Sequence, residues 1–244
     1  MRFWVFRTVL VAGLLGVPGG LAQVVHQPVP VERPAGSSVG FKFAWNQGRP
    51  WTSYTITVAD SGDTHFDGAA NPIDGGDGDD YGVDFTMSEA GRQKIFDLAK
   101  KADYFQGTLE GKAKNIAKTG EKTLEYHGVL ARGGAAATSA TYNYSGNTDV
   151  QELTRYFQAV ATTIDFGRKL AFDYRFDKLG MDAHLHSLQE MQASHFAEEI
   201  QAIEPILLKI ANDPNMMHIS RVTAKQLLKS IGSTVAAEQP SVQP

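Results

Sequence analysis

The first half of the chain alternates hydrophobic and polar residues with the two-residue period typical of β-strands. The alternation is clear over residues 41–45 and again over residues 54–58. A turn at residues 61–63 then leads directly into residues 64–67. Two alternating segments joined by so short a turn predict a β-hairpin.

Three more segments have the composition of strands. They cover residues 81–86, 123–131 and 136–144, and the last two flank a short turn at residues 132–134. Together the segments predict a sheet of about six strands. Because most of the connections are short, we expect the strands to run antiparallel.

Two amphipathic helices are predicted to cover one face of this sheet. The first opens at residues 86–89, where Thr86 and Glu89 have the spacing of a capping box, and its apolar stripe lies within residues 95–99. Asn147 or Thr148 caps the second, which keeps a 3.6-residue hydrophobic period as far as Ile164.

Beyond Gly167 the pattern is helical almost to the end of the chain. Pro205 should begin or kink a helix there, because proline lacks the backbone N–H and crowds the preceding turn. The apolar stripes of this region are Phe172, Phe176 and Leu179; Leu185, Leu188 and Met191; Phe196, Ile200, Ile203, Leu207 and Ile210; and Ile219, Val222, Leu227 and Leu228.

This order of strands followed by helices predicts an α+β fold: an antiparallel sheet of about six strands with two covering helices, then a C-terminal all-helical subdomain. The predicted organisation is a signal peptide at 1–22, a Pro-rich tether at 23–38, an α+β domain at 39–166, a helical subdomain at 167–231 and a disordered tail at 232–244.

The N-terminus has the features of a secretory signal peptide. Arg2 and Arg7 provide the positive start, residues 8–17 form an apolar segment, and small residues precede a cleavage site after Ala22. The apolar segment is shorter than the roughly 20 residues that a spanning helix needs. The sequence therefore predicts a secreted or periplasmic protein with no transmembrane segment after cleavage.

Composition and charge exclude several functional classes. Hydrophobic residues make up 42% of the 244 residues and charged residues 20%, as is ordinary for a globular protein. The formal charge of −4 argues against a nucleic-acid partner, which would select for basic residues. The chain contains no cysteine, which excludes disulfides, thiolate metal sites and cysteine nucleophiles.

The hairpin and helix together resemble a family of exported bacterial domains of unknown function. The likeness rests on residues 54–58 with Gly62 and Gly68 behind them, and on the helix that closes over residues 102–105. In the helical region it extends over residues 176–180 and 200–203, so that it covers roughly residues 50–231. The resemblance implies the fold and export, and it brings no catalytic residue.

An acidic, glycine-rich loop at residues 74–80 is a candidate calcium site. Carboxylates in a flexible loop suit a hard cation, and Asp77, Asp79 and Asp80 are the predicted ligands. The spacing does not match an EF-hand, and the alternative interpretation is an ordinary acidic turn, since turns favour Gly and Asp. No cofactor other than calcium is predicted.

Two further groups of residues could carry chemistry. Asp182, His186 and Glu190 have a four-residue spacing that places them on one helix face, where they could bind zinc or form a solvated surface. His65 and His127, with Asp67, could act in acid–base catalysis, although they are also ordinary residues of a half-exposed sheet.

The sequence favours a non-catalytic binding or structural module over an enzyme. We expect the sheet face opposite the two helices, rich in Thr and aromatic residues, to contact an unknown protein or a component of the cell envelope. The alternatives are a hydrolase whose site assembles from separate chain segments, and a calcium-stabilised scaffold.

Overall fold

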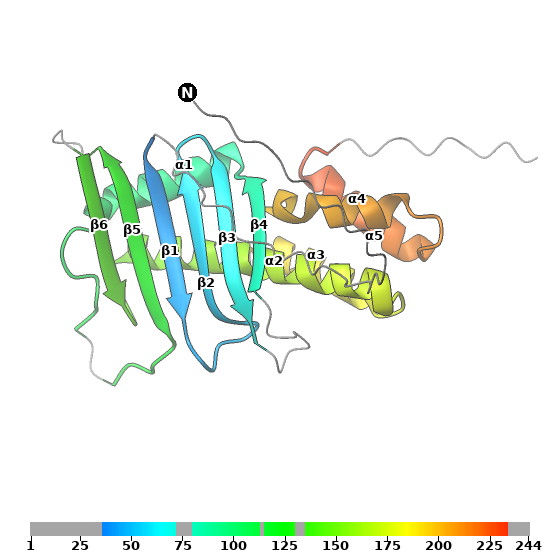
Figure 1. Cartoon of the computed structure of the whole chain (residues 1–244), viewed down its shortest axis with the longest axis horizontal. Helices are drawn as coiled ribbons and strands as arrows, with labels where there is room; N and C mark the ends of the chain where they lie inside the picture. Colours follow the sequence, from blue (N-terminus) through cyan, green and yellow to red (C-terminus); the bar gives the residue numbers. More distant parts are fainter. Residues whose placement is uncertain (1–35, 72–79, 113–114, 130–134, 234–244) are drawn as a thin grey trace, which may run out of the picture. The chain divides into compact units, whose positions relative to one another are not determined.

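The computed structural model describes residues 36–71, 80–112, 115–129 and 135–233. Their elements appear in Figure 1 in chain order from blue to red. The strands are β1 (Ser38–Ala44), β2 (Trp51–Ala59), β3 (Asp63–Ala70), β4 (Asp80–Thr86), β5 (Glu121–Val129) and β6 (Ala135–Tyr142). The helices are α1 (Glu89–Lys101), η2 (Asp103–Phe105), α2 (Thr148–Phe176), α3 (Met181–Ala193), η3 (Ile200–Ile203), α4 (Glu204–Asn212) and α5 (His218–Ser230).

The six strands form one antiparallel sheet in the order β4-β3-β2-β1-β5-β6. Both predicted hairpins are present, because β2 pairs with β3 and β5 pairs with β6. With the helices that follow, this arrangement confirms the α+β fold predicted from the hydrophobic pattern.

One face of the sheet packs against α1 and α2, which lie behind the strands in Figure 1. On that face, Phe41 stacks on Phe157 of α2 with 5.2 Å between the ring centroids. The indole N–H of Trp51 donates to the carbonyl of Ala161 at 3.1 Å, which fixes the end of β2 against the same helix. The two helices thus provide the predicted cover.

The last five helices enclose a second core, and α2 contributes to both. The second core is built from Leu170, Leu185, Leu207 and other apolar residues of these helices. The predicted period of the second helix was followed only to Ile164, and the helical subdomain was predicted to begin at residue 167, but α2 runs without a break to Phe176. A Cβ on Gly167 would overlap Ile203, so glycine at this position allows η3 to pack closely and does not end the helix.

One predicted apolar stripe lies on the surface. Phe172, Phe176 and Leu179 are 53%, 72% and 80% exposed, so they contribute little to either core. Pro205 lies in the first turn of α4, as expected for a residue without a backbone N–H. Among the helices that the structure describes, none combines the length and apolar character needed to cross a membrane.

Candidate functional site

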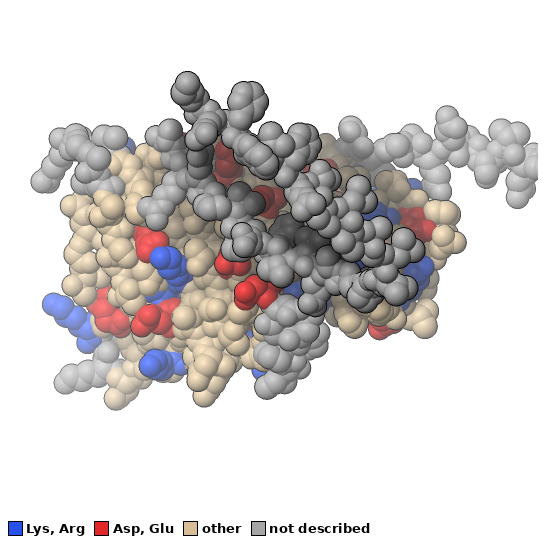
Figure 2. All heavy atoms as spheres, in the orientation of Figure 1, with Lys and Arg blue, Asp and Glu red and all other residues tan. Residues whose placement is uncertain are grey.

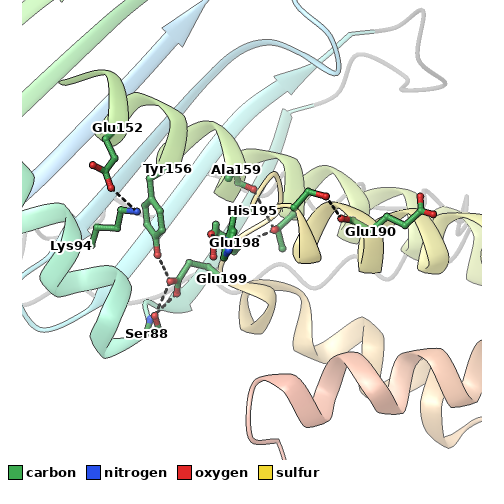
Figure 3. Close-up of polar contacts among 11 residues, drawn as sticks. Ser88, Lys94, Glu152, Tyr156, Ala159, Glu190, His195, Glu198 and Glu199 are labelled. Atoms are coloured by element: carbon green, nitrogen blue, oxygen red, sulfur yellow. Dashed lines mark hydrogen bonds and ion pairs between the residues drawn. The ribbon is translucent and has the colours of Figure 1, made fainter. Parts of the chain in front are cut away.

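The most extensively hydrogen-bonded buried carboxylate belongs to Glu199, which lies just before η3 and is only 7% exposed. The backbone N–H of Ser88 donates to its Oε2 at 2.7 Å, and the Ser88 hydroxyl donates to its Oε1 at 2.8 Å. The Tyr156 hydroxyl and the Gln201 side-chain amide also donate to this carboxylate. Figure 3 shows Glu199 between Ser88 at the start of α1 and Tyr156 on α2.

Glu199 completes the N-terminal cap of α1. The predicted capping box began at Thr86, but the capping residue is Ser88, whose hydroxyl accepts from the Gly91 N–H at 3.0 Å. A capping box normally has a Glu or Gln three residues after the cap, which accepts from the cap's own N–H. Here that position is Gly91, and Glu199 performs this role from 111 residues away in the sequence.

Gly91 is required at its position by the approach of Glu199. A Cβ there would overlap both Glu199 Oε1 and the Tyr156 hydroxyl. Gly91 therefore has two effects. It provides no carboxylate at the third position after the cap, and its missing side chain makes room for the carboxylate of Glu199.

Tyr156 is held as a hydrogen-bond donor. Burial, followed by the negative charge of Glu199, raises the pKa of Tyr156 well above its ordinary value. The Lys94 ammonium lies 5.2 Å from the centroid of the Tyr156 ring and 3.0 Å from Glu152 Oε1. Figure 3 shows the resulting series of contacts from Glu152 through Lys94 and Tyr156 to Glu199.

The turn before η3 contains two carboxylates that differ in burial, Glu198 and Glu199. Glu199 has a left-handed backbone with φ of 59°, an uncommon and strained conformation for a residue with a side chain. Glu198 is more exposed and accepts from His195 Nδ1 at 2.9 Å. The Thr163 hydroxyl donates to the Glu198 carbonyl at 2.6 Å, which fixes the turn against α2.

A pocket with a volume of about 470 Å³ adjoins this turn. Residues from the end of β4, the start of α1, the end of α3, the turn before η3, η3 itself and the end of α5 form its wall. Its polar lining side chains include Ser88, Gln192, Glu198, Glu199, Gln201 and Ser230.

This arrangement is better suited to holding structure and binding a ligand than to catalysis. The Glu199 carboxylate already accepts from four donor groups, so it has little capacity to remove a proton from a substrate. The Ser88 hydroxyl is used in both directions, since it accepts from Gly91 and donates to Glu199, so it is not poised as a nucleophile.

The second candidate surface is the sheet face opposite α1 and α2. None of the described helices packs along it, and Figure 2 shows acidic side chains spread over the strands. We call it the open face. The strand register places on it Asp63, Asp67, Asp80, Asp84, Glu121 and Glu125 together with Lys42, His65, His127 and several Thr and Ser residues.

The open face brings together only part of the predicted acid–base group. His65 Nδ1 lies 2.6 Å from Asp84 Oδ1, and their side chains are 39% and 82% exposed. His65 and His127 share the face, but β2 and β1 lie between their strands and their register rows are two residues apart. They are therefore about 16 Å apart, at ~4.8 Å per strand and ~3.4 Å per residue. An exposed pair on a flat sheet lacks the water-excluding pocket that a hydrolase site needs.

Of the three predicted calcium ligands, only Asp80 is among the described residues. Asp77 and Asp79 lie outside the described residues, whereas Asp80 is the exposed first residue of β4 and is paired with Ala69. Calcium binding by this loop therefore stays a prediction.

The predicted zinc stripe lies on α3. His186 Nε2 is 3.4 Å from Glu190 Oε1, and both side chains are about 70% exposed, at 71% and 69%. His184 lies elsewhere on the helix, where its Nδ1 is 2.5 Å from the buried carboxylate of Asp173 on α2. In the part of the chain that the structure describes, no three His, Asp or Glu side chains gather closely enough to hold a metal ion.

No family model, curated protein or solved structure matches the chain. The resemblance to exported bacterial domains therefore stays a prediction, and the geometry of the pocket and the open face carries the functional argument.

Proposed function

We propose that this protein is an exported, non-catalytic binding module whose open face binds a basic segment of another polypeptide. The observation that carries the proposal is the charge of that face. Six carboxylates and the single ammonium group of Lys42 give its strand residues a formal charge of −5 with histidines neutral. The whole chain carries only −4, so the remaining residues are close to neutral.

The carboxylates leave room for a cationic partner. Lys42 Nζ bonds Glu125 at 2.7 Å and His65 bonds Asp84, which leaves Asp67, Asp80 and other acids of the face available to a partner. Such a surface attracts basic ligands and repels acidic ones, and it accelerates encounter at low ionic strength.

The spacing of the acids supports an extended segment lying across the strands. Asp84 on β4 and Glu125 on β5 belong to the same register row, four strand steps apart. At ~4.8 Å per step this row is about 19 Å long, the length of about six extended residues. Thr57 and Gly40, between them, have small or no side chains, so the centre of the row is low.

The test is a titration of the mature chain with an extended Lys- and Arg-rich peptide, measured by calorimetry. We expect binding that weakens about tenfold or more between about 50 mM and about 300 mM salt, because screening shortens the reach of surface charges. A length-matched peptide with Gln at the basic positions is the control, and equal binding of that peptide would overturn the proposal.

Charge-neutralised variants locate the binding surface. Replacing Asp67 and Asp80 by Asn and Glu121 by Gln should weaken binding of the basic peptide strongly, because all three lie on the open face. The matched control removes three acids from the helices instead, with Asp97 and Asp182 changed to Asn and Glu190 to Gln. Equal losses from the two triple variants would mean that net charge alone drives binding.

A further inference from the structure

We propose that the pocket beside Glu199 is a second binding site, which takes a small organic cation with an ammonium or guanidinium group. The site is separate from the open face. Its wall comes from the ends of β4, α3 and α5, the start of α1, and the turn before η3 with η3 itself. Its volume of about 470 Å³ lies within the range of roughly 300–1,000 Å³ in which small-molecule sites fall.

The charge of the lining favours a cation. Two carboxylates, from Glu198 and Glu199, line the pocket, and its wall contains no lysine or arginine from the described residues. The basic side chain paired with these carboxylates is His195, whose Nδ1 lies 2.9 Å from Glu198 Oε1 and whose side chain is 84% exposed. A negatively charged ligand would be repelled by these two carboxylates, and no described lysine or arginine of the wall would attract it.

The hydrogen bonds within the wall leave acceptors for a ligand. The Gln192 amide donates to Ser230 Oγ at 2.9 Å, and the Ser230 hydroxyl donates to the Leu227 carbonyl at 2.6 Å. The Gln201 amide and the Ser88 hydroxyl both donate to Glu199. Each amide nitrogen keeps one further N–H, and the wall adds the amide oxygens of Gln192 and Gln201 and the carboxylate of Glu198, which suit a ligand that brings several N–H donors.

An organic cation fits this donor set better than a divalent metal ion does. Glu199 is already occupied by four donors, so Glu198 is the carboxylate with free capacity. Calcium takes about six to eight oxygen ligands, whereas an ammonium group needs about three acceptors. One carboxylate and two amide oxygens match the smaller demand.

The turn places Glu198 for this role. Both His195 and Glu199 have left-handed backbones with φ of 59°, and the Glu198 carbonyl is bonded to Thr163. This fixed backbone directs Glu199 toward α1, as Figure 3 shows, and Glu198 is part of the pocket wall. Strained, tightly held turns of this kind are found preferentially at ligand sites.

The experiment uses n-butylamine and agmatine as probes, with n-butanol and n-butyrate as matched neutral and anionic controls. Binding is followed by NMR through the side-chain amide signals of Gln192 and Gln201, which lie in the pocket wall. We expect both cations to shift these signals in a saturable manner and neither control to do so. Saturable shifts with butyrate, or no shifts with either cation, would overturn the proposal.

The Glu198→Gln variant supplies the second test. It removes the available carboxylate from a partly exposed position, so the fold should be retained, and the dissociation constant of the cations should rise about tenfold. Glu190→Gln, which removes an acid of α3 outside the wall, should leave the dissociation constant unchanged. Equal dissociation constants for wild type and Glu198→Gln would contradict the assignment.

Failure at this pocket and failure at the open face are distinguishable. The triple variant of Asp67, Asp80 and Glu121 should bind the small cations as wild type does, because none of these residues lines the pocket. Loss of small-cation binding in that variant would place the cation site on the sheet instead.

Discussion

Replacing the buried Glu199 by Ala should strongly destabilise the protein. The substitution removes the acceptor of the Tyr156 hydroxyl, in a buried hydrogen bond, and of the Ser88 backbone N–H, in a partly buried one. Leaving a buried donor without a partner costs about 1–3 kcal/mol. Taking about 3 kcal/mol for the buried hydroxyl and about 1 kcal/mol for the partly buried N–H gives an expected loss of about 4 kcal/mol in the free energy of unfolding.

Two other terms are small by comparison. Gln201 is half-buried, so its amide can turn toward solvent after the substitution. The left-handed backbone at position 199 is equally strained with Ala as with Glu, so no strain is released.

The assay is equilibrium unfolding in urea, followed by circular dichroism. A loss of about 4 kcal/mol should lower the midpoint without changing the slope, and should lower the thermal midpoint by about 8–16 °C for a domain of this size. Glu198→Ala is the control, with an expected loss of at most about 0.5 kcal/mol, because its partner His195 is exposed. A loss below about 1 kcal/mol for Glu199→Ala would refute the reasoning that Glu199 caps α1.

Three further predictions concern stability. Gly91→Ala should lower the free energy of unfolding because the new Cβ would displace Glu199, although Gly→Ala within a helix usually stabilises by about 1 kcal/mol. In a Glu199→Ala background, the same substitution should lower the free energy of unfolding much less, as measured by urea titration. Burial raises the pKa of Tyr142 to about 12, so the unfolded tyrosine ionises first as the pH rises above about 10, and stability should then fall. From this group alone the loss at pH 11 should be about 1.4 kcal/mol, and a flat stability profile between pH 9 and 11 would contradict it. Phe176→Ser should change the unfolding free energy by less than about 0.5 kcal/mol, whereas Leu185→Ala should cost about 2–5 kcal/mol, because the first side chain is 72% exposed and the second is fully buried.

The periodic elements of the fold were predictable from the sequence because they depend on local patterns. A two-residue period located β1 and β2, strand-like composition between turns located the others, and the short turns favoured antiparallel pairing. The stripe from Val150 to Ile164 located the second covering helix, since burial of one helix face leaves a 3.6-residue period.

Long-range contacts account for the predictions that were wrong. The spacing of Thr86 and Glu89 matched a capping box, but the cap formed at Ser88 because Glu199 approaches it from a distant turn. Gly167 was the predicted start of the helical subdomain, although it lies within α2 and its missing side chain allows close packing against Ile203. No local signal contains either partner.

The candidate site was missed for the same reason. Glu198 and Glu199 lie between Phe196 and Ile200 of a predicted apolar stripe, where they have the pattern of solvent-facing helix positions. Tyr156 has the pattern of an ordinary residue of an amphipathic helix. The one local sign was a glycine in the first turn of a predicted helix, at Gly91, where a helix-forming residue would have been expected. The acidity of the open face, by contrast, follows from the strand registers, which the sequence alone does not specify.

The most direct test of the binding role is an NMR titration of the chain from Gln23 onward with the basic peptide, in which backbone amide shifts are mapped onto the structure. The proposal predicts that the largest shifts fall on open-face strand residues such as Lys42, Thr55 and Asp67, with little change in the buried C-terminal core around Leu207. Shifts concentrated on the helices, or an absence of shifts at low salt, would contradict the assignment of the open face as the binding surface.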